Sequence, residues 1–114
     1  MAVENTAHAY DGVLSTVTFT ATDDDTATTS VNVIGQIVQC AINRSSGSAT
    51  CTVTFTDTTN DCELFSKSSA AATDLLPDDI NSGGGAYCRG PLKCTTTSAS
   101  GALTQTFIVY YVKM

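Results

Sequence analysis

The sequence predicts an all-β protein, an antiparallel β-sandwich of about six to seven strands with one short helix and a long disulfide-stapled loop. Polar and apolar residues alternate in several segments, as they do in strands with one buried face. These segments recur about every ten residues and are separated by clusters of turn residues, which is typical of sandwiches. Five cysteines and only 14% charged residues in 114 favour a small extracellular β-protein. We therefore expect residues 1–114 to form a single sandwich domain.

Alternation is strictest in two nearly identical segments, TVTFTATDDD at 16–25 and TVTFTDTTND at 52–61. In both segments Val and Phe share one face and Thr occupies the other, so each predicts a strand with its Val and Phe toward the core. The acidic ends predict turns. We expect the first strand to form a hairpin with residues 28–38, and the second to end at the tip DTTND.

The alternation stops after Cys62, where the predicted structure changes. The segment SKSSAAATDLL before Pro77 predicts a helix over about Lys67–Leu75 with Ser66 as its N-cap. Residues 78–94 contain two clusters of turn residues and predict a long loop. Residues 1–11 form a leader or arm. We expect a partner to bind the excursion at 66–94, which contains one aromatic residue, Tyr87.

The cysteines predict disulfide bonds and an oxidising compartment. The candidates are Cys40, Cys51, Cys62, Cys88 and Cys94. Local spacing favours a bridge between Cys88 and Cys94 that closes the loop YCRGPLKC. The second bridge is either Cys51–Cys62 or Cys40–Cys51, and one cysteine is left over. The absence of any CxxC pair disfavours a zinc site.

The two acidic tips are candidates for a calcium site, the one cofactor considered. Carboxylates of Asp23, Asp24 and Asp25 in the first tip could share an ion with Asp57 and Asp61 in the second, if folding brings the tips together. The alternative is that Asp occurs there because it stabilises turns. The alternating threonines could likewise order water on an ice-binding face, or be ordinary solvent-facing strand residues.

The segment TFIVYYV near the end of the chain is the most apolar and aromatic. Such a segment is either a central strand or a strand that pairs with another molecule. The residues of this candidate assembly strand are Phe107, Ile108, Val109, Tyr110 and Tyr111.

Charge and motif content disfavour several function classes. The net charge is −6 and no basic stripe is present, which disfavours nucleic acid as a partner. No apolar run approaches the length of a membrane span. The single histidine, His8, lacks a nucleophile motif, and Gly83–Gly85 lacks the pattern of a phosphate-binding loop. We therefore expect a protein that is not an enzyme.

The segment STVTFTATDDDTATTSVNVIG, Ser15–Gly35, resembles the hairpins of bacterial extracellular Ig-like repeat domains. The resemblance implies a role at the cell surface or in the extracellular matrix, without catalysis.

These observations lead to a functional expectation with two alternatives. We expect a non-catalytic extracellular structural or adhesive subunit of a surface assembly such as a filament or pilus, whose partner is itself or another surface protein. One alternative is a virion coat or decoration protein made without a signal peptide. The other is a small ligand- or ice-binding module. Whether Met1 is native or was added for expression stays open.

Overall fold

The computed structural model describes residues 2–4, 14–22, 24–44, 50–70, 73–75, 86–100 and 104–113. Within these ranges the regular elements are all strands, and every strand pair is antiparallel, so the all-β class is confirmed. No helix that could cross a membrane occurs in the described part. The strands are β1 (Ala2–Glu4), β2 (Leu14–Ala21), β3 (Asp25–Arg44), β4 (Thr50–Asp57), β5 (Cys62–Ala70), β6 (Thr73–Leu75), β7 (Ala86–Ser100) and β8 (Gln105–Lys113).

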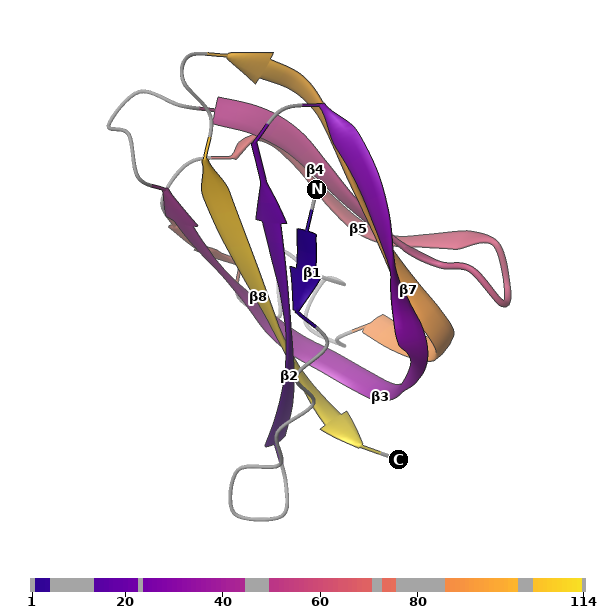
Figure 1. Ribbon diagram of the computed structural model, residues 1–114. Helices are drawn as coiled ribbons and strands as arrows, with labels where there is room; N and C mark the ends of the chain where they lie inside the picture. The colour runs from indigo at the N-terminus through magenta and orange to yellow at the C-terminus, as the bar shows by residue number, and fades with distance from the viewer. Residues whose placement is uncertain are drawn as a thin grey trace.

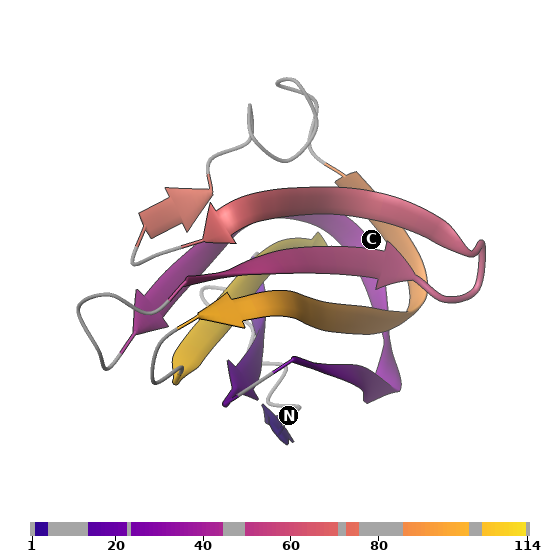
Figure 2. The ribbon, with the colours of Figure 1, turned by 90° about the horizontal axis from the view of Figure 1, so that it is seen from above.

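The sheet folds into two facing layers because β3 belongs to both. The strand order is β1-β2-β8-β3-β7-β4-β5, and β6 also pairs with β3. Residues 25–37 of β3 pair with β7, whereas residues 35–44 pair with β8. In Figure 1, β3 descends one side of the molecule, bends, and crosses into the other layer. Figure 2 shows β5, β4 and β7 side by side, with β8 behind them. The sandwich-like arrangement is as expected.

The bend in β3 depends on Gly35. This residue is paired with Cys88 of β7 on one side and with Lys113 of β8 on the other. A Cβ atom at Gly35 would overlap the backbone carbonyl of Val112. Only glycine allows the β3 and β8 backbones to approach so closely at the position where β3 changes layers.

Aromatic rings from both layers meet in the core. The Phe55 ring of β4 lies 5.8 Å from that of Phe19 on β2 and 6.3 Å from that of Phe107 on β8, both edge to face, and it stacks on Phe65 of β5 at 4.6 Å. All four side chains are buried. The two similar ten-residue segments therefore face each other across the core, and the prediction that their Val and Phe residues point inward is confirmed.

The apolar segment 107–111 lies in the middle of a layer. β8 is paired with β2 along one edge and with β3 along the other. Phe107, Val109 and Tyr111 are buried, while Ile108 and Tyr110 are half-buried. The expectation of a central strand is confirmed. The assembly alternative is wrong for this strand, because both of its edges are already occupied.

The predicted helix over Lys67–Leu75 is wrong. Residues 67–70 continue β5 and residues 73–75 form β6. The hydroxyl of Ser66, the predicted N-cap, instead donates to the carbonyl of Val53 at 3.1 Å and lies 3.0 Å from the hydroxyl of Thr54. Cross-strand bonds and the packing of Phe65 on Phe55 keep this segment extended, so tertiary contacts override local propensity.

Two other predicted connections also differ from the structure. Of the predicted loop at 78–94, residues 86–94 are extended in β7, between β3 and β4, and residues 78–85 lie outside the described residues. Residues 16–38 do not form a paired hairpin, because β2 pairs with β8 and the start of β3 pairs with β7. β4 ends at the tip DTTND as expected, but the residues after this turn form β5 and pair with β4, which was not predicted. In the predicted leader, residues 2–4 pair with β2.

Candidate functional site

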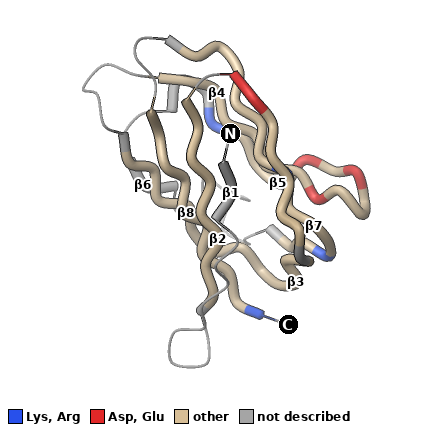
Figure 3. The backbone as a smooth tube through the Cα atoms, viewed as in Figure 1, with Lys and Arg blue, Asp and Glu red and all other residues tan. Residues whose placement is uncertain are grey.

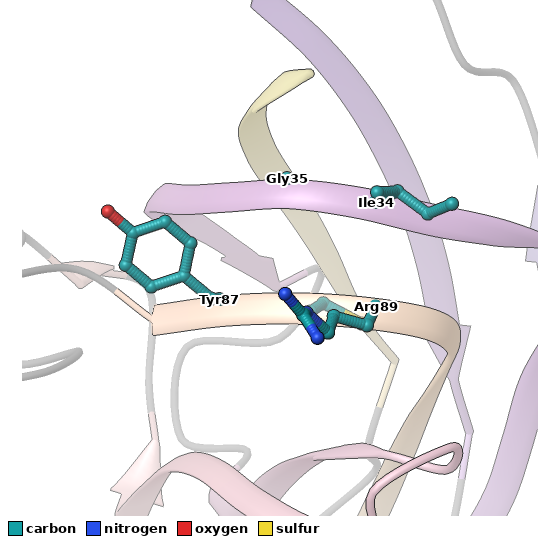
Figure 4. A pocket seen from close by; sticks show the side chains of 5 residues that line it. Ile34, Gly35, Tyr87 and Arg89 are labelled. Atoms are coloured by element: carbon teal, nitrogen blue, oxygen red, sulfur yellow. The ribbon is translucent and has the colours of Figure 1, made fainter. Parts of the chain in front are cut away.

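A small hollow lies on the outside of the molecule, where β3 leaves β7. It has a volume of ≈ 130 Å³. Its lining comes from two paired strands, with Ile34 and Gly35 on β3 and Tyr87, Cys88 and Arg89 on β7. Figure 4 shows Tyr87 and Arg89 on the same strand, with the Arg89 guanidinium turned along β7 toward Tyr87. The bend at Gly35, which has no side chain, leaves this part of the surface open.

Three of these side chains form what we call the Ile34–Tyr87–Arg89 patch. In the described part of the chain, the large hydrophobic side chains that are exposed are Ile34 at 45% and Tyr87 at 56%. Ile34 lies directly opposite Arg89 in the ladder, and Tyr87 is its diagonal neighbour. Residues on either side of them in sequence, such as Val33 and Cys88, point into the core. Strand alternation therefore places the patch residues outward.

The guanidinium of Arg89 is exposed and forms no ion pair within the described residues. Its backbone N–H is engaged, donating to the Asp57 carboxylate at 3.1 Å. The backbone is thus fixed while the cation stays available. A guanidinium can bind a carboxylate through two parallel hydrogen bonds, so this patch can recognise an acidic group next to a small or apolar one.

A buried carboxylate organises the adjacent tip between β4 and β5. Asp57 is 0% exposed. Its Oδ1 accepts a hydrogen bond from the Thr59 backbone at 3.0 Å, and its Oδ2 accepts one from the Asn60 side chain at 2.8 Å. Burial acts to raise the pKa of Asp57. The hydrogen bonds from Asn60, Arg89 and Thr59 outweigh it and hold the pKa below the ordinary value of 3.8.

The same tip is fastened to β7. The backbone N–H and the hydroxyl of Thr58 both donate to the carbonyl of Pro91, at 3.2 and 2.8 Å. Thr59 occupies the space that a side chain at Gly90 would need. Beyond these contacts the tip projects past β7 (Figure 1), and Figure 3 shows its acidic residues. Asp61 and Glu63 are exposed there, and we call these two residues the acidic tip.

Among the described aspartates, the structure does not bring the two predicted acidic tips together. Asp25 pairs with Thr96 and Asp57 with Leu92, a separation of about 13 Å along β7. The Asp57 carboxylate is already occupied by hydrogen bonds. No three His, Cys, Asp or Glu side chains are grouped to hold a metal within the described ranges.

The described aspartates of the first acidic tip, Asp24 and Asp25, accept backbone hydrogen bonds. Oδ1 of Asp24 accepts the backbone N–H of Ala99 at 2.7 Å, and Oδ1 of Asp25 accepts that of Thr26 at 2.7 Å. Asp23 lies outside the described residues. The Thr26 contact fits the alternative in which aspartates stabilise the turn, whereas the Ala99 contact fastens the tip to β7.

None of the predicted disulfides forms, and all five thiols are free. Cys88 and Cys94 lie on the same face of β7, about 20 Å apart along an extended strand, whereas bridged Cα atoms lie within about 7 Å. Cys51 and Cys62 sit at opposite ends of the β4–β5 hairpin, paired with Ala70 and Asp57. The predictions failed because YCRGPLKC is extended.

The buried thiols behave as core side chains. Cys40, Cys51, Cys88 and Cys94 are buried, and only Cys62 is exposed. The Cys51 thiol donates to Oε1 of Gln105 at 2.9 Å, which links β4 to β8 across the core. Burial, with a smaller contribution from the negative charge of Asp24, raises the pKa of Cys51 to about 11. A buried thiol of this kind is unreactive.

The two threonine series do not share a surface. Because Phe19 and Phe55 meet between the layers, the threonines of β2 and β4 point to opposite outer sides. Those of β4 instead join a row of hydroxyls across four strands, in the order Thr26, Thr95, Thr54, Ser66. Hydrogen bonds link Thr26 to Thr95 and Thr54 to Ser66. The two segments therefore do not form the shared threonine array of the ice-binding alternative.

Comparisons with known proteins identify no relative: no protein-family model matches the chain, and no curated protein matches it. The assignment of a site therefore rests on the structure. Sequence reasoning pointed to Tyr87, within residues 66–94, but not to Ile34 or Arg89. A signal for Ile34 exists in VNVIGQIV, where it is one of two large apolar residues, with Val38, that are out of phase with Val33, Gly35 and Ile37.

Proposed function

We propose that this chain is a non-catalytic structural or adhesive subunit of a surface assembly, such as a filament or pilus, and that the Ile34–Tyr87–Arg89 patch contacts its partner. The observation that carries the proposal is a pair of exposed apolar side chains beside an arginine without an ion pair in the described residues. Tyr and Arg are enriched among the residues that dominate binding energy at protein interfaces.

The surroundings of the patch support a contact role. Asn32, two residues before Ile34 on the same outer face of β3, is exposed, so a polar side chain adjoins the apolar centre, as at the rim of protein interfaces. The patch stands on two hydrogen-bonded strands, and little backbone freedom would be lost on binding. Burying the exposed parts of Tyr87 and Ile34 would contribute about 25 cal/mol per Å² of apolar area.

The chemistry of the hollow supports binding over catalysis. Of the residues that line it, the one with a nucleophilic side chain is Cys88, which is 1% exposed and points into the core. Burial raises the pKa of the Cys88 thiol, so the reactive thiolate is scarce at neutral pH. The Arg89 guanidinium supplies hydrogen-bond donors and a positive charge.

Substitution at Tyr87 tests this proposal. We expect the wild-type chain to form filaments or other oligomers in negative-stain microscopy and size-exclusion chromatography, and Tyr87→Ser to weaken assembly by roughly tenfold or more. Thr97→Ser, an exposed change on the same face of β7, is the matched control and should assemble normally. A strictly monomeric wild type, or a Tyr87→Ser variant that assembles like the control, would contradict the proposal.

The free thiols favour a second candidate, a virion coat or decoration protein. The geometry of β7 and of the β4–β5 hairpin separates the pairs that spacing favoured, and a virion protein made in a reducing compartment needs no disulfide. The thiols can be counted by alkylation in denaturant without reductant, on chain recovered from an oxidising compartment. Five alkylated thiols per chain favour the virion protein. A number lower by two or four, which indicates one or two disulfides, favours the extracellular subunit.

A further inference from the structure

We infer that the Ile34–Tyr87–Arg89 patch binds the acidic tip of a second copy of this chain. The inference rests on the proposed function, because it takes the patch as the contact surface, and it names the partner. Three observations support it. The patch and the acidic tip carry opposite charges without an ion pair in the described residues, hydrogen bonds hold the tip in shape, and the hollow has the size of a side chain.

Charge provides the first argument. Asp61 and Glu63 are exposed, and neither forms an ion pair with any cation of the described residues. Arg89 on the same chain is likewise without a carboxylate partner there. Among the described residues, each copy thus presents a cation, Arg89, and an acidic pair, Asp61 and Glu63, that are not neutralised by one another or by another described side chain. An arginine paired with a carboxylate and shielded from water is among the strongest charge-assisted contacts in proteins.

A copy cannot satisfy its own patch with its own tip. Thr58 and Thr59 of the tip are fastened against Pro91 and Gly90 of β7. Gly90 is on the buried side of β7, whereas the neighbouring side chain of Arg89 points outward. The tip therefore meets β7 from the side opposite to the guanidinium, and the partner carboxylate must come from another molecule.

Shape and rigidity provide the second argument. A hollow of ≈ 130 Å³ is smaller than the usual site for a small-molecule ligand, about 300–1,000 Å³, but admits a protein side chain. Cys62 is exposed between Asp61 and Glu63, so a small side chain is flanked by two carboxylates. The bonds of Asp57 fix this tip before binding, which lowers the entropic cost of docking.

The contact joins two different surfaces of the same chain. Each copy carries both surfaces, so the association either closes as a two-fold pair with both tips engaged or continues head to tail into a filament. Both arrangements depend on the same residues, so the same variants test them.

Charge reversal on each side of the contact provides the test. By sedimentation velocity, Arg89→Glu and the double variant Asp61→Lys/Glu63→Lys should each self-associate at least tenfold more weakly than the wild type. An equimolar mixture of the two should associate again, because each variant presents the charges that the other lacks. Lys67→Glu on β5 has the same net charge as Arg89→Glu and serves as the control.

The outcomes separate this inference from the proposed function. Weaker self-association of both variants, together with recovered association in their mixture, supports the contact. An Arg89→Glu protein that associates like Lys67→Glu, a mixture that does not recover, or a wild type that is monomeric at every concentration overturns it. If Tyr87→Ser prevents assembly while charge reversal does not, the patch is still the contact surface, but its partner is not the acidic tip.

Discussion

Asp57 shows how one buried carboxylate can stabilise a functional tip. Its position at the end of β4 places it beside the turn residues Thr59 and Asn60 and the backbone of Arg89. The cost of burying a charge is offset because the carboxylate accepts several hydrogen bonds. The residue therefore links the shape of the acidic tip to the strand that carries the patch.

We expect Asp57→Asn to lower the free energy of unfolding by about 1–3 kcal/mol at neutral pH, since charge-assisted bonds are lost. The lowered pKa of Asp57 means that its contribution is fully present above the unfolded value of 3.8 and is lost as pH falls through the folded pKa. The difference between wild type and variant should therefore narrow below about pH 4. Urea unfolding at a series of pH values measures it, with Asp61→Asn as control. A difference that stays constant with pH would contradict this account.

At the scale of elements, alternation was a good guide where a strand has one buried face. It located β2 and β4, because the Val and Phe residues of these strands face the core, whereas β8 was predicted from its continuous apolar and aromatic run. It failed at β7, where Gly90 and Pro91 are local turn signals. In the fold Gly90 makes room for Thr59. Pro91 borders the irregularity between Thr28 and Asn32, where the β3–β7 ladder is already interrupted, and such positions tolerate proline.

The candidate site could be predicted only in part, because local sequence patterns do not show which distant strands lie side by side. Tyr87 stands out locally as an aromatic residue among turn residues. Ile34 and Arg89 lie side by side because of the register between β3 and β7, although the two residues are more than fifty positions apart in sequence. No local sequence pattern encodes this register. The disulfide predictions failed likewise, because spacing along the chain was read as proximity in space.

The central position of β8 predicts unequal protection from hydrogen exchange. Both edges of β8 are paired, whereas β5 lies at the end of the strand order and its pairing with β4 has two irregularities. We expect the amides of β8 to exchange only through global unfolding, and those of β5 to exchange faster through local opening. Native-state exchange followed by mass spectrometry of peptides measures the two rates. Equal rates for β5 and β8 would mean that this end of the sheet is as stable as its centre.

At the scale of the whole molecule, the two layers are joined by β3 and by a core with Phe55 near its centre. Phe55 of β4 stacks on Phe65 of the neighbouring β5 and also contacts Phe19 of β2 and Phe107 of β8, two strands that do not pair with β4 in the sheet. Backbone hydrogen bonds connect the two layers through β3. The aromatic contacts, in addition, hold the inner faces of the layers against each other.

The contrast between Phe55 and Tyr87 tests whether core and surface aromatic residues have separate roles. Phe55→Ala should cost about 3–5 kcal/mol, because it removes a fully buried ring. That is a large share of the roughly 5–15 kcal/mol that stabilises a typical domain, so the milder Phe55→Leu keeps the comparison measurable if the alanine variant does not fold. Tyr87→Ala removes a ring that is 56% exposed, and surface changes are usually within about 0.5 kcal/mol. Urea unfolding of the three variants compares them. A large loss at Tyr87 would mean that its exposure serves the fold, whereas a small loss leaves binding as the physical reason for keeping an aromatic ring in water.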